Sequence, residues 1–219
     1  GLGDVYKRQE LLDFLSKSPT AFHAVENYRQ ILNADGFKEL LESEHWDIVP
    51  GGKYYVTRNN TSILAFKVGT KLDNYSFNIV TSHTDSPTFK VKENAEIEVK
   101  NKYTQLNTEG YGGMLCATWL DRPLSIAGRV LVSEGNSIVT KLLNIDRDLL
   151  MIPNVAIHMN RAANDGFKYN LQVDMLPLLS AGDDRQKDFK QIIADELGVK
   201  KEDILGPVSY THLTLPTNS

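Results

Sequence analysis

The chain has 219 residues, of which 41% are hydrophobic and 24% charged, and its formal net charge is −4. This is the composition of an ordinary globular protein, and a weakly acidic balance without a basic cluster argues against nucleic acid or an anionic membrane as a partner. No apolar run approaches the ~20 residues of a membrane span, and a single cysteine, Cys116, excludes an internal disulfide and fits a reducing cytoplasm.

The two ends of the chain, residues 1–9 and 208–219, do not match the sequence between them. The letters "DVYKRQ" can be encoded by DNA whose reverse complement, read in a shifted frame, gives "VSYTH". Both ends therefore correspond to one DNA element read from opposite strands, and that element resembles the transposon end used to prepare sequencing libraries. We interpret both ends as artefactual adapter translations and exclude them from the fold. We expect residues 10–207 to be a fragment of a longer protein.

Residues 10–92 are predicted to mix helices and strands. A helix is expected to begin after Ser18, a capping residue, and to end at Gly36. Residues 53–69 have the pattern of a β-hairpin around an Arg–Asn–Asn turn. The near-continuous apolar run at 74–87 predicts a strand that is covered on both faces. Together these elements favour an α/β sandwich.

The pattern changes near residue 93. Residues 95–113 and 124–145 alternate polar and apolar side chains, as antiparallel strands with one solvent-exposed face do, and Gly135 lies in a turn signal. Residues 185–199 form an amphipathic pattern that predicts a helix ending at Gly198. We therefore predict a second, β-rich domain over residues 93–207.

The best candidate for chemistry is the pair His83 and Asp85. It follows the predicted buried strand, and ligands of α/β sheets gather at the carboxyl ends of strands. Residues two apart on a strand point to one side. A neutral imidazole is a good zinc ligand, and a nearby carboxylate can fix its orientation. By spacing alone, a structural hydrogen-bonded His–Asp pair is an equally good interpretation.

The other histidines give weaker signals. His23 is expected to be an ordinary, partly exposed side chain of the first helix, and His45 a loop residue. The H-E-x-x-H zinc motif is absent, as are a C-x-x-C pair, a G-x-S-x-G elbow and a phosphate-binding glycine loop. The residues alone therefore leave the function open.

Longer segments carry a family resemblance. The stretches "SPTAFHAV", "SHTDSPTFKVK", "EGYGGMLCATWLDRPLSIAGRV" and "IPNVAIHMNR" follow one another in the order and spacing of the M18 zinc aminopeptidases, the aspartyl aminopeptidase group. The sequence resembles that family over residues 18–162, and the likeness thins afterwards. The resemblance implies the first part of an α/β/α zinc-peptidase sandwich, with residues 10–92 belonging to the catalytic domain. It also implies part of an inserted β-rich dimerisation domain, residues 93–207.

The same resemblance assigns roles to individual residues. His83 matches the family's first zinc-ligand histidine, and Asp85 matches a carboxylate that supports the metal centre. His158 matches a histidine of the inserted domain that reaches into the active site of a neighbouring subunit, although a surface histidine remains the alternative. Asp121 and Arg122 fall in the inserted domain and are expected to be structural or interface residues.

The resemblance also implies a reaction and an assembly. Two zinc ions per active site and a glutamate general base would hydrolyse N-terminal, acidic residues from peptides, in a cytoplasmic homo-oligomer that builds from dimers to a dodecamer. Most ligands would lie beyond residue 207, so we expect this chain alone to be inactive. Two alternatives remain: a non-catalytic oligomerisation or scaffold protein of the same fold, and an unrelated single-metal hydrolase using His83 and Asp85.

Overall fold

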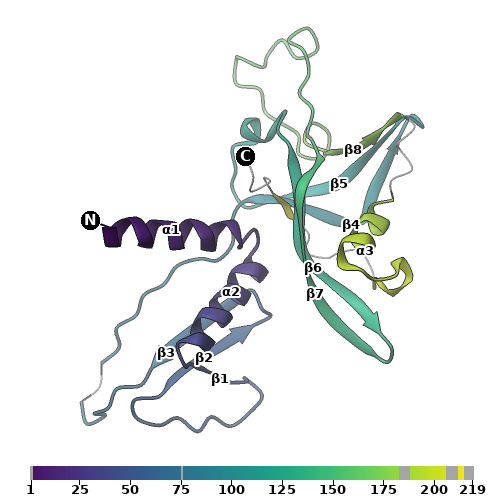
Figure 1. Ribbon diagram of the computed structural model, residues 1–219. Helices are drawn as coiled ribbons and strands as arrows, with labels where there is room; N and C mark the ends of the chain where they lie inside the picture. Colours follow the sequence, from purple (N-terminus) through teal and green to yellow (C-terminus); the bar gives the residue numbers. More distant parts are fainter. Residues whose placement is uncertain (1, 75, 183–187, 206–211, 215–219) are drawn as a thin grey trace. The chain divides into compact units, whose positions relative to one another are not determined.

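The structure, a computed structural model, describes residues 2–74, 76–182, 188–205 and 212–214. It divides into two compact units, Gly1–Ser86 and Pro87–Ser219, each of which is considered by itself (Figure 1). The division falls at residue 87 rather than at the expected residue 93. The reason is that strand β4 (Thr88–Val99) runs through residues 92 and 93 without a break.

The first unit pairs two helices with a small sheet. Its elements are α1 (Leu2–Ser16), α2 (Ala21–Ala34), β1 (Lys38–Glu39), β2 (Lys53–Arg58) and β3 (Ser62–Lys67). The sheet has the order β1-β2-β3, with β1 parallel and β3 antiparallel to β2, and α2 lies along one of its faces (Figure 1). Buried side chains of the helix and of β2, among them Val25 and Tyr55, form the small core of this unit.

Helix α2 begins after Thr20, so the prediction of a cap at Ser18 was wrong. The Thr20 Oγ1 atom accepts a hydrogen bond from the backbone N–H of His23, at 3.5 Å. Ser18 lies before the helix, and its hydroxyl accepts a hydrogen bond of 2.9 Å from Asn27 Nδ2. Because Ser and Thr both cap helices well, the sequence alone did not separate the two positions. The helix ends as predicted before Gly36, which has φ +80°.

The predicted hairpin is confirmed. Strands β2 and β3 pair from Lys53 opposite Lys67 to Arg58 opposite Ser62. Asn59 and Asn60 form the turn with φ values of 51° and 54°. Asparagine tolerates this left-handed region better than other non-glycine residues, which is why the turn could be predicted locally.

The predicted buried strand at 74–87 is wrong for the described residues, which omit Tyr75. Residues 76–87 form no strand, and Phe77, Ile79 and Val80 are 78%, 76% and 98% exposed. The Thr84 hydroxyl donates to the carbonyl of Thr61 in the hairpin turn, at 2.8 Å. A strand forms only where another strand supplies hydrogen-bond partners, and no described segment pairs with residues 76–82.

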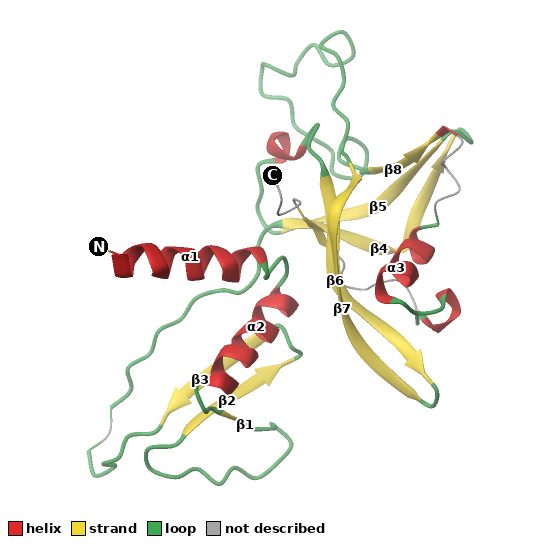
Figure 2. Cartoon of the chain, viewed as in Figure 1, coloured by secondary structure: helices red, strands yellow, loops and turns green. Residues whose placement is uncertain are grey.

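The second unit is built on a six-stranded sheet of order β7-β6-β9-β4-β5-β8 (Figure 2). Besides β4, its strands are β5 (Tyr103–Tyr111), β6 (Leu124–Glu134), β7 (Ser137–Leu150), β8 (Leu178–Ala181) and β9 (His212–Thr214). Its helices are η1 (Cys116–Trp119), α3 (Phe189–Leu197) and η3 (Lys201–Asp203). The β-rich character and the hairpin turn at Gly135 agree with the sequence.

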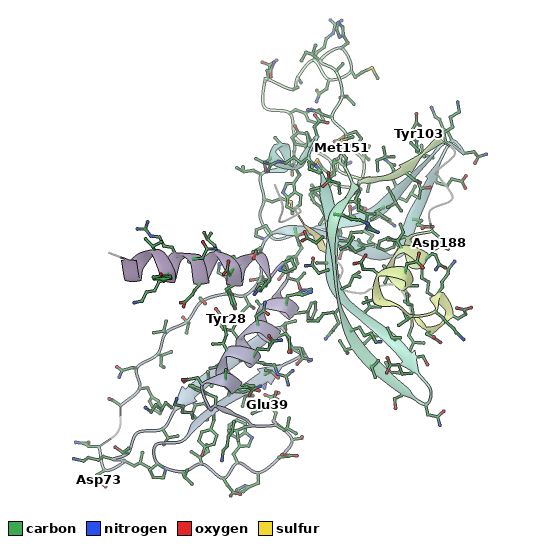
Figure 3. All side chains as sticks on the ribbon, viewed as in Figure 1. Tyr28, Glu39, Asp73, Tyr103, Met151 and Asp188 are labelled. Atoms are coloured by element: carbon green, nitrogen blue, oxygen red, sulfur yellow. The ribbon has the colours of Figure 1, made fainter. Side chains whose placement is uncertain are left out.

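One apolar cluster holds this unit together. Buried apolar residues of β4, β5, β6 and β7 form one cluster with side chains of α3 such as Ile193. Phe89 is fully buried and contacts the ring of Trp119 edge-on, with centroids 5.2 Å apart. Helix α3 is capped by Asp188, labelled in Figure 3, and ends at Gly198 as predicted; residues 185–187 of the expected helix lie outside the described part.

Strand β9 falls in the segment that we interpret as adapter translation. His212 pairs with Lys90 of β4 and with Ala127 of β6, antiparallel to both. Residues 208–211 and 215–219 of this segment lie outside the described part of the chain. None of the described helices is long and apolar enough to cross a lipid bilayer.

His23 is buried, contrary to expectation. Its side chain is 9% exposed because the whole first turn of α2 is covered. Its Nδ1 atom lies 2.8 Å from Thr20 Oγ1, which already accepts from the His23 N–H and can donate its proton to a neutral ring. Burial lowers the pKa of His23 from 6.5 to about 4. The imidazole is therefore neutral at physiological pH.

We expect His23 to make the first unit acid-sensitive. Between pH 6.5 and 4 only the unfolded state binds the proton, so the free energy of unfolding falls as the pH drops through this range, by up to about 3 kcal/mol. Above pH 6.5 the ring is neutral in both states and contributes nothing. Urea unfolding followed by Trp46 fluorescence at pH 7 and 4.5 measures the loss. The His23→Gln variant should lose less stability on acidification, whereas His45→Gln, at an exposed loop position, should behave like the original chain; equal losses in all three would contradict this assignment.

Candidate metal-binding site

The structure brings His83 and Asp85 into contact. The Nδ1 atom of His83 lies 2.8 Å from the backbone carbonyl oxygen of Asp85 and 3.3 Å from its carboxylate Oδ1. A carbonyl oxygen can only accept a hydrogen bond, so Nδ1 carries the proton in this contact. In the tautomer with its proton on Nδ1, the imidazole has its lone pair on Nε2, the nitrogen that can bind a metal ion.

Both side chains are accessible. The His83 side chain is 81% exposed and that of Asp85 is 49% exposed. They lie on an extended segment rather than at the end of a buried strand, so the expected setting was wrong although the two side chains do meet. The contact depends only on residues two apart in the chain. Thr84, which lies between them, is held to the hairpin turn by its hydrogen bond to Thr61.

This pair fits one arm of a zinc site. A protein zinc site uses three or four ligands, and the described residues contain no group of three His, Cys, Asp or Glu side chains that could hold a metal ion. His83 offers one imidazole nitrogen of the right kind, and Asp85 offers the second contact that orients it. The donor atoms are of a kind that binds zinc, but they are too few for a zinc site, which therefore needs further ligands.

His158 belongs to the second unit and not to the unit of His83. It lies on the long connection between β7 and β8, drawn as loop in Figure 2, and its side chain is exposed. Its neighbours Ile157 and Met159 are 48% and 79% exposed. The predicted catalytic role of His158 stays a prediction, and its exposure leaves the ring accessible in this chain.

Asp121 makes hydrogen bonds to the backbone of the segment that precedes His158. The Asp121 N–H donates to the carbonyl of Ile152 at 2.9 Å, and its Oδ1 accepts from the N–H of Asn154 at 2.8 Å. Leu120 also bridges to Ile152. Asp121 itself has φ +55°, a conformation in which Asp and Asn are tolerated. Its structural role, expected from the family resemblance of this stretch, is thus supported.

We expect Asp121→Ala to loosen residues 152–155. Alanine removes the acceptor for Asn154 and is strained at positive φ, so the second unit should lose about 1–3 kcal/mol of stability and the Asn154 amide should exchange faster. Asp121→Asn keeps both the oxygen and the tolerance of positive φ and should be nearly neutral. Hydrogen–deuterium exchange on both variants provides the measurement. Slow exchange at Asn154 in Asp121→Ala would show that this contact is not needed.

Solved structures define the class of fold. The chain superposes on a cryo-EM structure of the Ape4 and Nbr1 complex with a TM-score of 0.84 and 34% identity, covering 94% of this chain and 43% of that one. It also matches the S. cerevisiae mApe1 dodecamer structure with a TM-score of 0.73 and 26% identity, covering 94% of this chain and 47% of that one. The two units together are part of an aminopeptidase fold.

Sequence comparisons then give the family. The model of the aminopeptidase I zinc metalloproteases (M18) matches residues 14–208, so the chain belongs to the M18 family. A probable M18 family aminopeptidase 2 of Clostridium novyi is 48% identical over 202 residues, covering 90% of this chain and 47% of the relative. The aspartyl aminopeptidase of Dictyostelium discoideum is 45% identical over 176 residues, covering 79% and 36%. The chain thus spans about half the length of its curated relatives or less.

Proposed function

We propose that the protein to which this chain belongs is a metallo-aminopeptidase that removes N-terminal residues, acidic ones by preference, from peptides. Membership of the M18 family supports the reaction, and the likeness to an aspartyl aminopeptidase supports the acidic preference. The observation that carries the proposal is the His83–Asp85 contact, which lies inside the matched range and leaves Nε2 able to bind metal. We infer a cytoplasmic location from the single cysteine.

His83 would hold zinc through Nε2, while Asp85 keeps the ring oriented and the proton on Nδ1. Zinc, when bound, activates water and polarises the peptide carbonyl, and two ions per active site are part of the proposal. A pair of ions needs several more ligands than one imidazole. The remaining ligands and the general base would come from outside these residues, so this chain alone should not turn over substrate.

Residues 10–92 would then be the first part of the catalytic domain, and residues 93–207 part of an inserted dimerisation domain. The relative in the yeast structure is a dodecamer, which supports a homo-oligomer for this protein as well. In such an assembly the accessible ring of His158 would act in the active site of a neighbouring subunit. Residues 1–9 and 208–219 remain, in this proposal, adapter translations outside the M18 sequence.

The test compares two proteins: the 219-residue chain and the product of the uninterrupted gene, recovered by resequencing without a transposon step. Both are loaded with zinc and assayed on aspartyl- and leucyl-nitroanilides. We expect turnover, faster on the aspartyl substrate, from the uninterrupted product and none above background from the chain. If the 219-residue chain itself hydrolysed a substrate, the proposal that it lacks essential ligands would be refuted. If the uninterrupted gene product folded and bound zinc but was inactive, the proposal that it is an aminopeptidase would be refuted.

A second candidate is a non-catalytic oligomerisation protein of the same fold. The more extensive core and sheet of the β-rich unit favour it. It predicts that the uninterrupted gene product assembles but binds no zinc. Metal analysis of that product decides between the two candidates.

A further inference from the structure

The sheet of the second unit contains a strand position that is held by a foreign sequence. Strand β9 separates β6 from β4 in the sheet, and it belongs to the segment that we interpret as adapter translation. Strands β4 and β6 have 12 and 11 residues, whereas β9 has 3 (Figure 2). The foreign strand therefore pairs with only a small part of each neighbour.

The two strands beside this position are built as interior strands. Residues 124–128 of β6 are all buried, and so are Thr88, Phe89 and Val91 of β4. Natural sheet edges are protected by charges, prolines, bulges or covering segments. Here Lys90 is the only charged residue of the two stretches and neither contains a proline, and the one irregularity is a register shift against β7 between Leu124 and Ile126. These stretches are suited to having a strand on each side.

The residues just before the 208–219 segment already run alongside β6. Ile204 lies opposite Val132 of β6 in an antiparallel bridge, and the Leu205 N–H donates to the carbonyl of Leu131 at 3.0 Å. Further along, His212 lies opposite Ala127 of the same strand. The direction along β6 is thus set by residues 204 and 205, before the 208–219 segment begins.

We propose that the position between β4 and β6 belongs to the segment that directly follows Leu205 in the uninterrupted protein. This chain spans about half of its relatives, so a parent of their length continues well beyond this point. Beyond Pro207, the last residue of the natural sequence, the segment would run antiparallel to both neighbours, without a further proline, and with apolar side chains at least at alternate positions. An unrelated sequence can hold part of the position because backbone hydrogen bonds drive strand addition.

Two versions of the 219-residue chain test this. In the first, residues 206–219 are replaced by alternating glycine and serine; in the second, by the same number of residues from the uninterrupted gene. Hydrogen–deuterium exchange is followed in residues 88–91 and 124–128, with the β6–β7 turn at 133–139 as reference. We expect exchange about tenfold or more slower in the second version, with the reference unchanged. Equal exchange in the two versions overturns the proposal, as does protection that appears only with rising protein concentration, which would assign the position to a second copy.

A second measurement decides the matter if the glycine–serine version does not fold. In the uninterrupted protein, the ten residues after Leu205 should exchange as slowly as 124–128 of β6. Exchange at the rate of an open loop would overturn the assignment. Neither experiment uses peptide hydrolysis, so a failed aminopeptidase assay and a failed strand assignment are separate results.

Discussion

In the uninterrupted protein, His83→Ala should lower aminopeptidase turnover by more than about 100-fold and reduce the zinc content. Residues that merely support a metal ligand already cost 10–100-fold when they are changed, and His83 is proposed to be a ligand itself. Alanine removes Nε2, the nitrogen that the Asp85 contact leaves able to bind. Turnover on aspartyl-nitroanilide and zinc content per chain are the two measurements.

The chain offers a matched control in His45. This histidine also lies near a carboxylate two residues on, with Nε2 3.7 Å from Asp47, and its side chain is 93% exposed. His45→Ala should keep both activity and zinc. Asp85→Asn should fall between the two variants, because the backbone carbonyl that accepts from Nδ1 remains while the carboxylate is lost. Full activity with a full zinc complement in His83→Ala would end the metal-ligand assignment.

Phe89→Ala should destabilise the second unit by about 3–5 kcal/mol, a large part of the stability of an ordinary domain. The ring is fully buried in the apolar cluster of this unit and contacts Trp119 edge-on, so its removal loses transfer free energy and leaves a cavity. Urea unfolding followed by Trp119 fluorescence, in a Trp46→Phe background, reports on this unit. The emission of Trp119 should also change in the folded state, because its aromatic neighbour is gone.

Ile138→Ala is the control in the same unit. Ile138 lies on β7 and is 67% exposed, so its loss should change the free energy of unfolding by less than about 0.5 kcal/mol. If Phe89→Ala cost no more than Ile138→Ala, the apolar cluster around β4 would not be the core that holds this unit together.

Elements fixed by local chemistry could be predicted from the sequence. The Asn59–Asn60 turn and the stop of α3 at Gly198 were predicted because positive φ restricts the choice of residue. The apolar run around Ile79 was predicted to be a buried strand, and that was wrong because burial depends on strands that no local pattern can supply. Apolar composition indicates that a segment is suited to burial, but whether it is buried depends on other parts of the chain.

The candidate site was predictable in part for the same reason. His83 and Asp85 meet because they are two residues apart, and the sequence shows that spacing directly. The burial of His23 was not predicted, because the sequence of this helix turn does not differ from that of an ordinary amphipathic turn with one exposed face. The contact of Asp121 with Asn154 spans 33 residues, and no local pattern in the sequence indicated it.

The uncovered apolar residues at 77–80 have a consequence for biosynthesis. A parent of the relatives' length still has well over half its residues to be translated when this segment leaves the ribosome. At roughly 5–20 residues per second, Phe77, Ile79 and Val80 would wait on the order of 10–50 s for their cover. Apolar surface exposed for that interval is prone to aggregation, so the yield of the intact protein is expected to depend on how quickly the rest of the chain is synthesised.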